Sequence, residues 1–189
     1  MGLKITFWGV RGSVPTSGRD TVIYGGNTPC VQVETDKRNL IFDGGTGIVK
    51  LGDKMIEEKG VKDTDIFFSH MHWDHIQGLP FFTPFYYPGN HFRLYGHDGD
   101  NKTLKEIITG QMVQPYFPIT MEIMKSEILF KGIEPDMVMD MGYGVIVKTF
   151  ALDHPGGSLS YRIESGDNSV VYCTDTETLY NDSRKKLIR

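Results

Sequence analysis

The sequence lacks the features that mark several common classes of protein. It contains only two cysteines in 189 residues, Cys30 and Cys173, which is too few to build a disulfide framework. No apolar run approaches the roughly 18 residues that a membrane-spanning helix needs. The first 30 residues contain no apolar stretch of the kind found in secretory signals. These absences predict a cytoplasmic protein with reduced thiols and no membrane contact.

Neither sign of charge dominates the chain. The 20 Lys and Arg residues stand against 24 Asp and Glu residues, and the formal net charge is −4. A mildly acidic chain is poorly suited to bind nucleic acid through its net charge, although a local basic patch is compatible with this total. Hydrophobic residues make up 39% and charged residues 23%, which is typical of a folded globular chain. Residues 1–189 are therefore predicted to form one domain.

The hydrophobic pattern predicts mixed strands and helices. Helical spacing of apolar residues indicates a helix over 48–59, with Gly60 as its stop, and a second helix lies near 103–109. Residues 80–130 are rich in aromatic residues and proline, and we interpret them as an insertion into the domain. Alternating or short apolar runs predict strands over 3–8, 30–35, 40–42, 65–69, 92–95, 145–150, 159–164 and 169–173.

One short segment concentrates metal-binding side chains. Directly after a predicted strand, six residues contain His70, His72, Asp74 and His75. This segment includes three of the six histidines in the chain. Imidazole nitrogens and carboxylate oxygens are good ligands for Zn²⁺ and similar divalent ions. A polar loop in solvent, without a metal, could account for a single histidine. It accounts poorly for three histidines and an aspartate in so short a segment. The spacing predicts that His70 and His72 converge on one ion while Asp74 and His75 turn toward a second.

The pattern His-x-His-x-Asp-His after an apolar strand resembles the signature of the metallo-β-lactamase superfamily. Three further segments follow the family's order: LIFDGGTG with Asp43, LDHPGG with His154, and YCTDT with Asp175. The resemblance implies that His154 completes the first metal site with His70 and His72. It implies that Asp175 bridges both metals and that Asp43 holds the metal-binding loop in place without being a ligand.

The flanking segments FWGVRGSVP and YGGNT resemble a branch close to ribonuclease Z, which includes cyclic-nucleotide phosphodiesterases such as the phage anti-Pycsar enzymes. This resemblance implies an α/β fold, a metallo-β-lactamase-like αββα four-layer sandwich. It implies hydrolysis of cyclic nucleotides or RNA-type phosphodiesters by a hydroxide held between two divalent ions, Zn or Mn. Asp74 would orient that nucleophile and accept its proton. Related phosphodiesterases pair their subunits, so a homodimer is expected.

One feature departs from the family pattern. The family's last metal-binding histidine lies well beyond the bridging aspartate, but no histidine follows His154 here. We therefore expect the chain to correspond to the first two-thirds of such an enzyme, to lack the final strands of the sandwich, to hold the second ion weakly and to hydrolyse phosphodiesters poorly by itself. A thioester hydrolase of the glyoxalase II kind and an inactive nucleotide-binding remnant are the alternative functions.

Two sets of residues in the 80–130 segment have open roles. His91 and His97 are expected to be structural or solvated, because a single histidine is seldom a ligand. Tyr116 and Phe117 are candidates for stacking on a nucleobase. Packing in the core or in a dimer interface is the more common role of such aromatic side chains.

Overall fold

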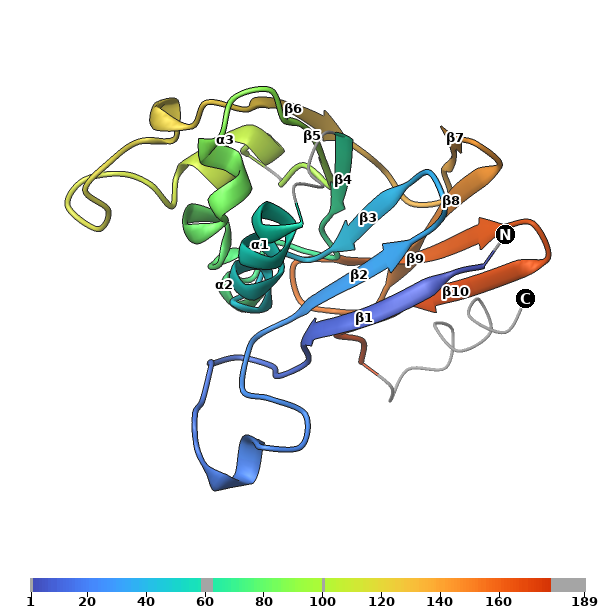
Figure 1. Cartoon of the computed structure of the whole chain (residues 1–189), viewed down its shortest axis with the longest axis horizontal. Helices are drawn as coiled ribbons and strands as arrows, with labels where there is room; N and C mark the ends of the chain where they lie inside the picture. The colour runs from blue at the N-terminus through green and yellow to red at the C-terminus, as the bar shows by residue number, and fades with distance from the viewer. Residues whose placement is uncertain (1, 59–62, 100, 178–189) are drawn as a thin grey trace.

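Two facing β-sheets form the centre of the structure, a computed structural model that describes residues 2–58, 63–99 and 101–177 (Figure 1). The six-stranded sheet has the order β1-β2-β3-β4-β5-β6, and the four-stranded sheet has the order β10-β9-β8-β7. The strands of the first sheet are β1 (Lys4–Gly9), β2 (Cys30–Glu34), β3 (Asn39–Phe42), β4 (Asp63–Phe67), β5 (His91–Gly96) and β6 (Glu127–Gly132). Those of the second are β7 (Val138–Gly142), β8 (Val145–Leu152), β9 (Ser158–Ser165) and β10 (Asn168–Tyr172).

Three α-helices accompany the six-stranded sheet in the described part of the chain: α1 (Gly47–Glu57), α2 (Trp73–Ile76) and α3 (Leu104–Thr109). Four short 3₁₀ helices, η1 to η4, occupy Arg19–Thr21, Leu79–Phe81, Thr83–Tyr86 and Met121–Ile123. None of the helices formed by the described residues is both long and apolar enough to cross a bilayer.

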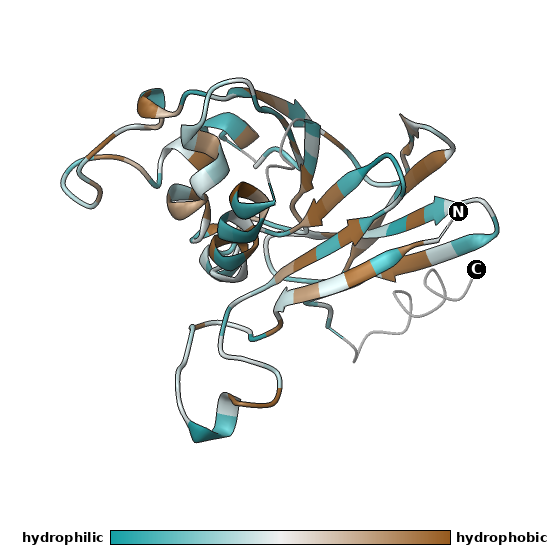
Figure 2. Cartoon of the chain, in the orientation of Figure 1, coloured by the Kyte–Doolittle hydropathy of each residue, from teal (hydrophilic) through white to brown (hydrophobic). Residues whose placement is uncertain are grey.

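Side chains of the six-stranded sheet point alternately to two cores, as the period of two requires. Ile41 and Ile66 face the helices and pack in a cluster with Leu51 of α1. Their neighbours Phe42 and Phe67 face the other way and pack against the four-stranded sheet. The alternation of hydrophobic and hydrophilic residues is visible along several strands in Figure 2. A helical layer and two sheets packed face to face confirm the predicted α/β sandwich.

Most predicted elements are present, with small differences at their ends. The 30–35 and 40–42 arms form an antiparallel hairpin in which Val31 pairs with Phe42. The helix predicted over 48–59 is α1, but its predicted stop at Gly60 lies outside the described residues. The strands β6 and β7 were not predicted. Both are short edge strands, EILFKG and VMDMG, and apolar runs this short do not distinguish a strand from other structure by pattern alone.

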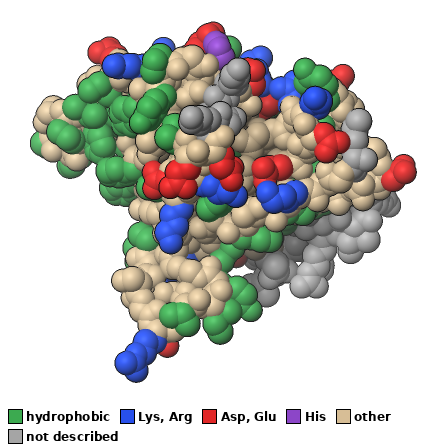
Figure 3. Space-filling model, in the orientation of Figure 1, with side chains coloured by type: hydrophobic (Ala, Val, Ile, Leu, Met, Phe, Trp, Pro, Cys, Tyr) green, Lys and Arg blue, Asp and Glu red, His purple; other side chains and the backbone are tan. Residues whose placement is uncertain are grey.

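The 80–130 segment is partly built into the sheet. Its strand β5 pairs in parallel with β4 and with β6, so both strands extend the six-stranded sheet. The segment between them carries α3 and extends away from the sheet in Figure 1. Hydrophobic side chains gather on the surface of that region, at the upper left of Figure 3.

Candidate metal centre

The predicted ligands come from strand ends in both sheets. β4 ends at Phe67, and the segment shortly after it, residues 69–75 (the histidine loop), includes the first residues of α2. β4 runs parallel to β3, so the loop after β3 leaves the sheet at the same edge. In the four-stranded sheet, His154 follows β8 and Asp175 follows β10. The fold therefore brings together residues that are far apart in the sequence.

The loop after β3 packs closely on the histidine loop because it contains glycine. A Cβ atom at Gly45 would lie 2.3 Å from the carbonyl oxygen of Asp74, which is closer than any side chain can come. The Gly44 N–H donates to the carbonyl of His75 at 2.7 Å, and the Gly78 N–H donates to the carbonyl of Gly44 at 2.9 Å. These bonds fix the backbone that carries Asp74 and His75.

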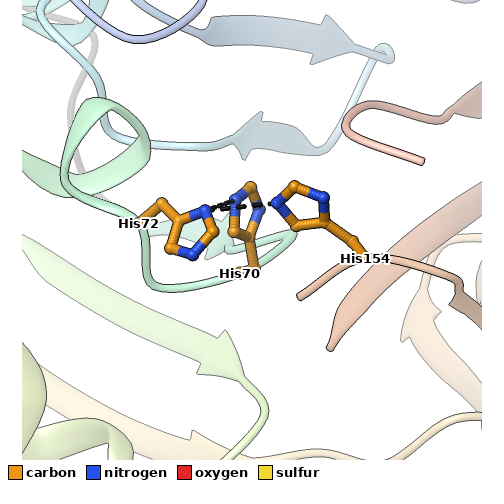
Figure 4. Close-up of side chains that lie close together, drawn as sticks. All are labelled: His70, His72 and His154. Atoms are coloured by element: carbon orange, nitrogen blue, oxygen red, sulfur yellow. Dashed lines mark hydrogen bonds between the residues drawn. The ribbon is translucent and has the colours of Figure 1, made fainter. Parts of the chain in front are cut away.

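Three histidines converge in the first donor group. His70 Nε2 lies 2.9 Å from His72 Nδ1, and His154 Nε2 lies 3.2 Å from the same His72 atom. Figure 4 shows the three rings with these nitrogens turned toward one another. Zinc–nitrogen distances of about 2.0–2.1 Å place the ligand atoms of a tetrahedral ion about 3.3–3.4 Å apart. The His70 and His154 nitrogens are therefore about as far from His72 Nδ1 as two ligands of one divalent ion are from each other, and all three atoms lie within 4.8 Å of one another.

A second donor group shares His70 with the first and adds His75 and Asp175. The Asp175 Oδ2 atom lies 3.4 Å from His75 Nε2, 3.7 Å from His70 Nε2 and 3.9 Å from His154 Nε2. This carboxylate therefore lies beside both groups. Asp74 is close but is not a member of either group: its Oδ2 is 3.5 Å from His75 Nε2.

The unsatisfied polar atoms of the centre fit a divalent cation. His75 Nδ1 is bonded to Asp43, but His75 Nε2 is buried and has no hydrogen-bond partner among the described residues. A buried nitrogen without a partner is costly unless something else binds it. The donors around it are imidazoles and carboxylates, the ligand types that divalent transition metals accept. The residues present therefore fit a metal ion at this position.

Asp43 is the buried anchor of the histidine loop. Its carboxylate accepts hydrogen bonds from the Ser69 N–H at 2.7 Å, the Ser69 hydroxyl at 2.8 Å and the Tyr172 hydroxyl at 2.6 Å, and it lies 2.7 Å from His75 Nδ1. Its backbone has a φ of 61°, in the left-handed region. A proton held on Nδ1 by this carboxylate leaves the Nε2 lone pair of His75 available to a metal.

Burial and nearby charges shift the pKa values of His70 and His75 in opposite directions. Burial, followed by the neighbouring His75, lowers the pKa of His70 to about 4, so its imidazole is neutral at pH 7. Burial also lowers the pKa of His75, but the hydrogen bond and charge of Asp43, with the charges of Asp74 and Asp175, outweigh it and raise that pKa. The carboxylates around His75 thus favour a positive charge there, which a bound divalent ion supplies.

Replacing Asp43 with alanine is expected to weaken metal binding without removing a ligand. Hydrogen-bonding partners of metal ligands typically contribute about 10- to 100-fold to affinity, and His75 would lose its fixed orientation. Competition with a chelator of known affinity measures the change. Asp53→Ala, which alters an exposed α1 carboxylate that bonds Thr83, is the matched control. Unchanged affinity in a folded Asp43→Ala protein would contradict this role.

Tyr172 was missed by sequence reasoning. Its position in a predicted strand gave no sign that its hydroxyl reaches Asp43, 129 residues away in the sequence. Burial, followed by the charge of Asp43, raises the pKa of Tyr172 well above its usual value. The phenol therefore keeps its proton and donates a hydrogen bond to the carboxylate.

Tyr172→Phe is expected to weaken metal binding by less than Asp43→Ala does, because three of the four contacts to the carboxylate remain. The free energy of unfolding of the variant should also fall by about 1–3 kcal/mol, because the buried Asp43 loses a hydrogen bond. Urea unfolding and chelator competition measure both effects. Tyr143→Phe, at an exposed turn residue, should change neither.

The two remaining predicted sets lie apart from the donors. His91 Nδ1 is 2.9 Å from Glu127, and His97 Nδ1 is 3.2 Å from Glu134, and neither histidine belongs to the two donor groups. Phe117 packs edge-on against Phe81 with ring centroids 5.7 Å apart, whereas Tyr116 is 86% exposed.

Comparison with known proteins supplies a family. Residues 38–188 match the family described as beta-lactamase superfamily domain. Two curated relatives are called ribonuclease Z. The one from Natronomonas pharaonis is 26% identical over 166 residues, which cover 86% of this chain and 48% of the relative. The one from Thermoplasma acidophilum is 30% identical over 169 residues, which cover 87% and 49%. The chain thus spans about half the length of these relatives.

Solved structures share the fold. The metallo-beta-lactamase fold protein YhfI from Bacillus subtilis superimposes with a TM-score of 0.67 at 22% identity, covering 97% of this chain and 66% of YhfI. Unliganded yeast PDE1 superimposes with a TM-score of 0.66 at 15% identity, covering 96% of this chain and 67% of PDE1. At these identities the likeness concerns the fold alone.

Proposed function

Because the chain belongs to the beta-lactamase superfamily, we propose that it is a metal-dependent hydrolase that cleaves phosphodiesters. The observation that carries the proposal is the pair of donor groups that share His70, with the Asp175 carboxylate beside both. A site of this kind is suited to two divalent ions, for which zinc and manganese are the candidates.

Two bound ions would lower the pKa of water and neutralise negative charge on phosphoryl oxygens. In the proposal, His70, His72 and His154 would hold the first ion, and Asp74, His75 and Asp175 would hold the second, with Asp175 shared. Asp74 would also orient the attacking water and accept its proton. Asp43 and Tyr172 keep His75 in place, through the hydrogen bonds that converge on the Asp43 carboxylate.

Cyclic nucleotides or RNA-type phosphodiesters are the proposed substrates. The support is similarity to proteins called ribonuclease Z, together with the sequence flanks that resemble the same branch. The class of substrate is tested by incubating the chain, saturated with manganese or zinc, with bis-p-nitrophenyl phosphate, 3′,5′-cyclic nucleotides, a short RNA and S-lactoylglutathione. Cleavage of phosphodiesters that disappears in His154→Ala would support the proposal. Cleavage of the thioester alone would reject it in favour of a glyoxalase II activity, and metal binding without any turnover would favour an inactive remnant.

We also propose that two chains associate. Three consecutive apolar side chains, Val22, Ile23 and Tyr24, are 78–82% exposed on the loop that projects between β1 and β2. Exposed apolar patches of this kind often mark contacts between proteins. Light scattering at micromolar concentration should give twice the 21.4 kDa mass of one chain. A single-chain mass at that concentration would reject the homodimer.

A further inference from the structure

A cleft of about 430 Å³ opens beside the histidine loop. One wall comes from the histidine loop and α2, and the other from α3 and the residues around it. The lining residues that matter for its chemistry are Met71, Trp73, Lys102, Gln111 and Tyr116.

Two large aromatic side chains that line this cleft are exposed to solvent. Trp73 is 73% exposed and Tyr116 is 86% exposed, although each offers a large apolar surface to bury. Single exposed apolar residues are common on protein surfaces. Two aromatic rings that line one cleft from different elements instead form a surface on which a flat ring can stack.

The cleft adjoins the metal centre. Trp73 lies between His72 and Asp74 in the chain, so its Cα is about 3.8 Å from the Cα of each. Met71 and Ile107 line the cleft and also a smaller cavity of about 190 Å³ whose wall includes His70. The cleft and this cavity therefore share wall residues next to the histidine loop.

The polar groups of the cleft suit a nucleotide. Lys102 places a positive charge on the wall, where it favours a phosphate. The Glu106 carboxylate is occupied by Thr103, accepting from its N–H at 2.8 Å and its hydroxyl at 2.9 Å. The side-chain oxygen of Gln111 is buried and has no hydrogen-bond partner among the described residues. It is an acceptor that an N–H group of a base can satisfy after a small side-chain movement.

We propose that this cleft binds the nucleobase of a nucleotide by stacking it on Trp73 and Tyr116. The inference rests on the proposed function for its biological meaning, because the base would belong to the phosphodiester substrate. The binding itself does not require turnover. Stacking tolerates every base, so the cleft would favour nucleotides over other phosphates without selecting one base strongly.

Fluorescence tests the proposal directly, since Trp8 and Trp73 are the two tryptophans of the chain. In a Trp8→Phe protein, Trp73 is the sole indole reporter. The ligands are the four nucleoside 5′-monophosphates and ribose 5-phosphate, which carries the same phosphate without a base. We expect nucleotides to quench the fluorescence and to bind more tightly than ribose 5-phosphate. Tyr116→Ala should weaken nucleotide binding roughly 5- to 150-fold, the range measured for loss of one stacking partner.

Tyr87→Ala is the matched control, because Tyr87 is 48% exposed but lies outside the cleft. Calorimetry with Trp73→Leu should show a loss similar to that of Tyr116→Ala. The proposal is overturned when ribose 5-phosphate binds as tightly as every nucleotide, or when Tyr116→Ala leaves the affinity unchanged. Phosphodiester cleavage without base-dependent binding would reject the cleft but not the hydrolase. Base-dependent binding without cleavage would reject the hydrolase but not the cleft.

Discussion

Metal retained after dialysis should fall to background when His70 and His72 are both replaced by alanine. His70 Nε2 belongs to both donor groups, so its loss removes an atom from each. His72 Nδ1 lies within 3.2 Å of both partner nitrogens in the first group, so the same variant leaves His154 there alone. A divalent ion held by fewer protein ligands exchanges them more readily for water. Elemental analysis of the dialysed protein measures the result.

The histidines outside the centre supply a matched double control. His91 and His97 are about half exposed and lie beside Glu127 and Glu134, away from the donor groups. His91→Ala/His97→Ala also removes two imidazoles, and it should retain the metal content of the unaltered chain. Circular dichroism verifies that both variants are folded. Equal metal in the two double variants would refute the ligand assignment.

The histidine loop was predictable because its chemistry is local. Four ligand-type side chains in six residues after a strand indicate a metal site by their spacing alone. In the structure, His70 and His72 share one donor group and His70 and His75 share the other, while Asp74, predicted beside His75, belongs to neither. The distant partners are different, since His154 and Asp175 could be assigned only through resemblance to a family. No local pattern says that the ends of β8 and β10 meet the end of β4.

Contacts across the sandwich depend on three-dimensional packing, which sequence patterns do not encode. The hydrogen bond between Tyr172 and Asp43 joins the two sheets. The neighbours Tyr116 and Phe117 make the same point, because they have similar side chains and different surroundings. Phe117 contacts Phe81, while Tyr116 is exposed to solvent and lines the same cleft as Trp73. The sequence alone does not distinguish the role of Tyr116 from that of Phe117, because their surroundings differ only in the folded structure.

The largest effect on turnover is expected at Asp74. Its Oδ2 accepts a hydrogen bond at 2.7 Å from the N–H of Ser13, which lies in the long loop after β1. The bond fixes the carboxylate beside His75 Nε2, at 3.5 Å. Asp74→Asn keeps an oxygen that can accept from Ser13, so the loop can hold its position. The amide is not basic, however, and cannot take a proton from water.

At saturating metal, Asp74→Asn should lower kcat for a phosphodiester by roughly 10²- to 10⁴-fold, the usual range for a lost general base. The first donor group contains only His70, His72 and His154, so one ion should remain bound to the variant. Asp53→Asn on α1 is the control, because that exposed carboxylate contacts Thr83 instead. Measuring kcat across metal concentrations separates the two roles proposed for Asp74. If excess metal restores the rate, Asp74 acts only as a ligand. If the rate stays low with both ions bound, the loss lies in the activation of the attacking water and not in metal occupancy.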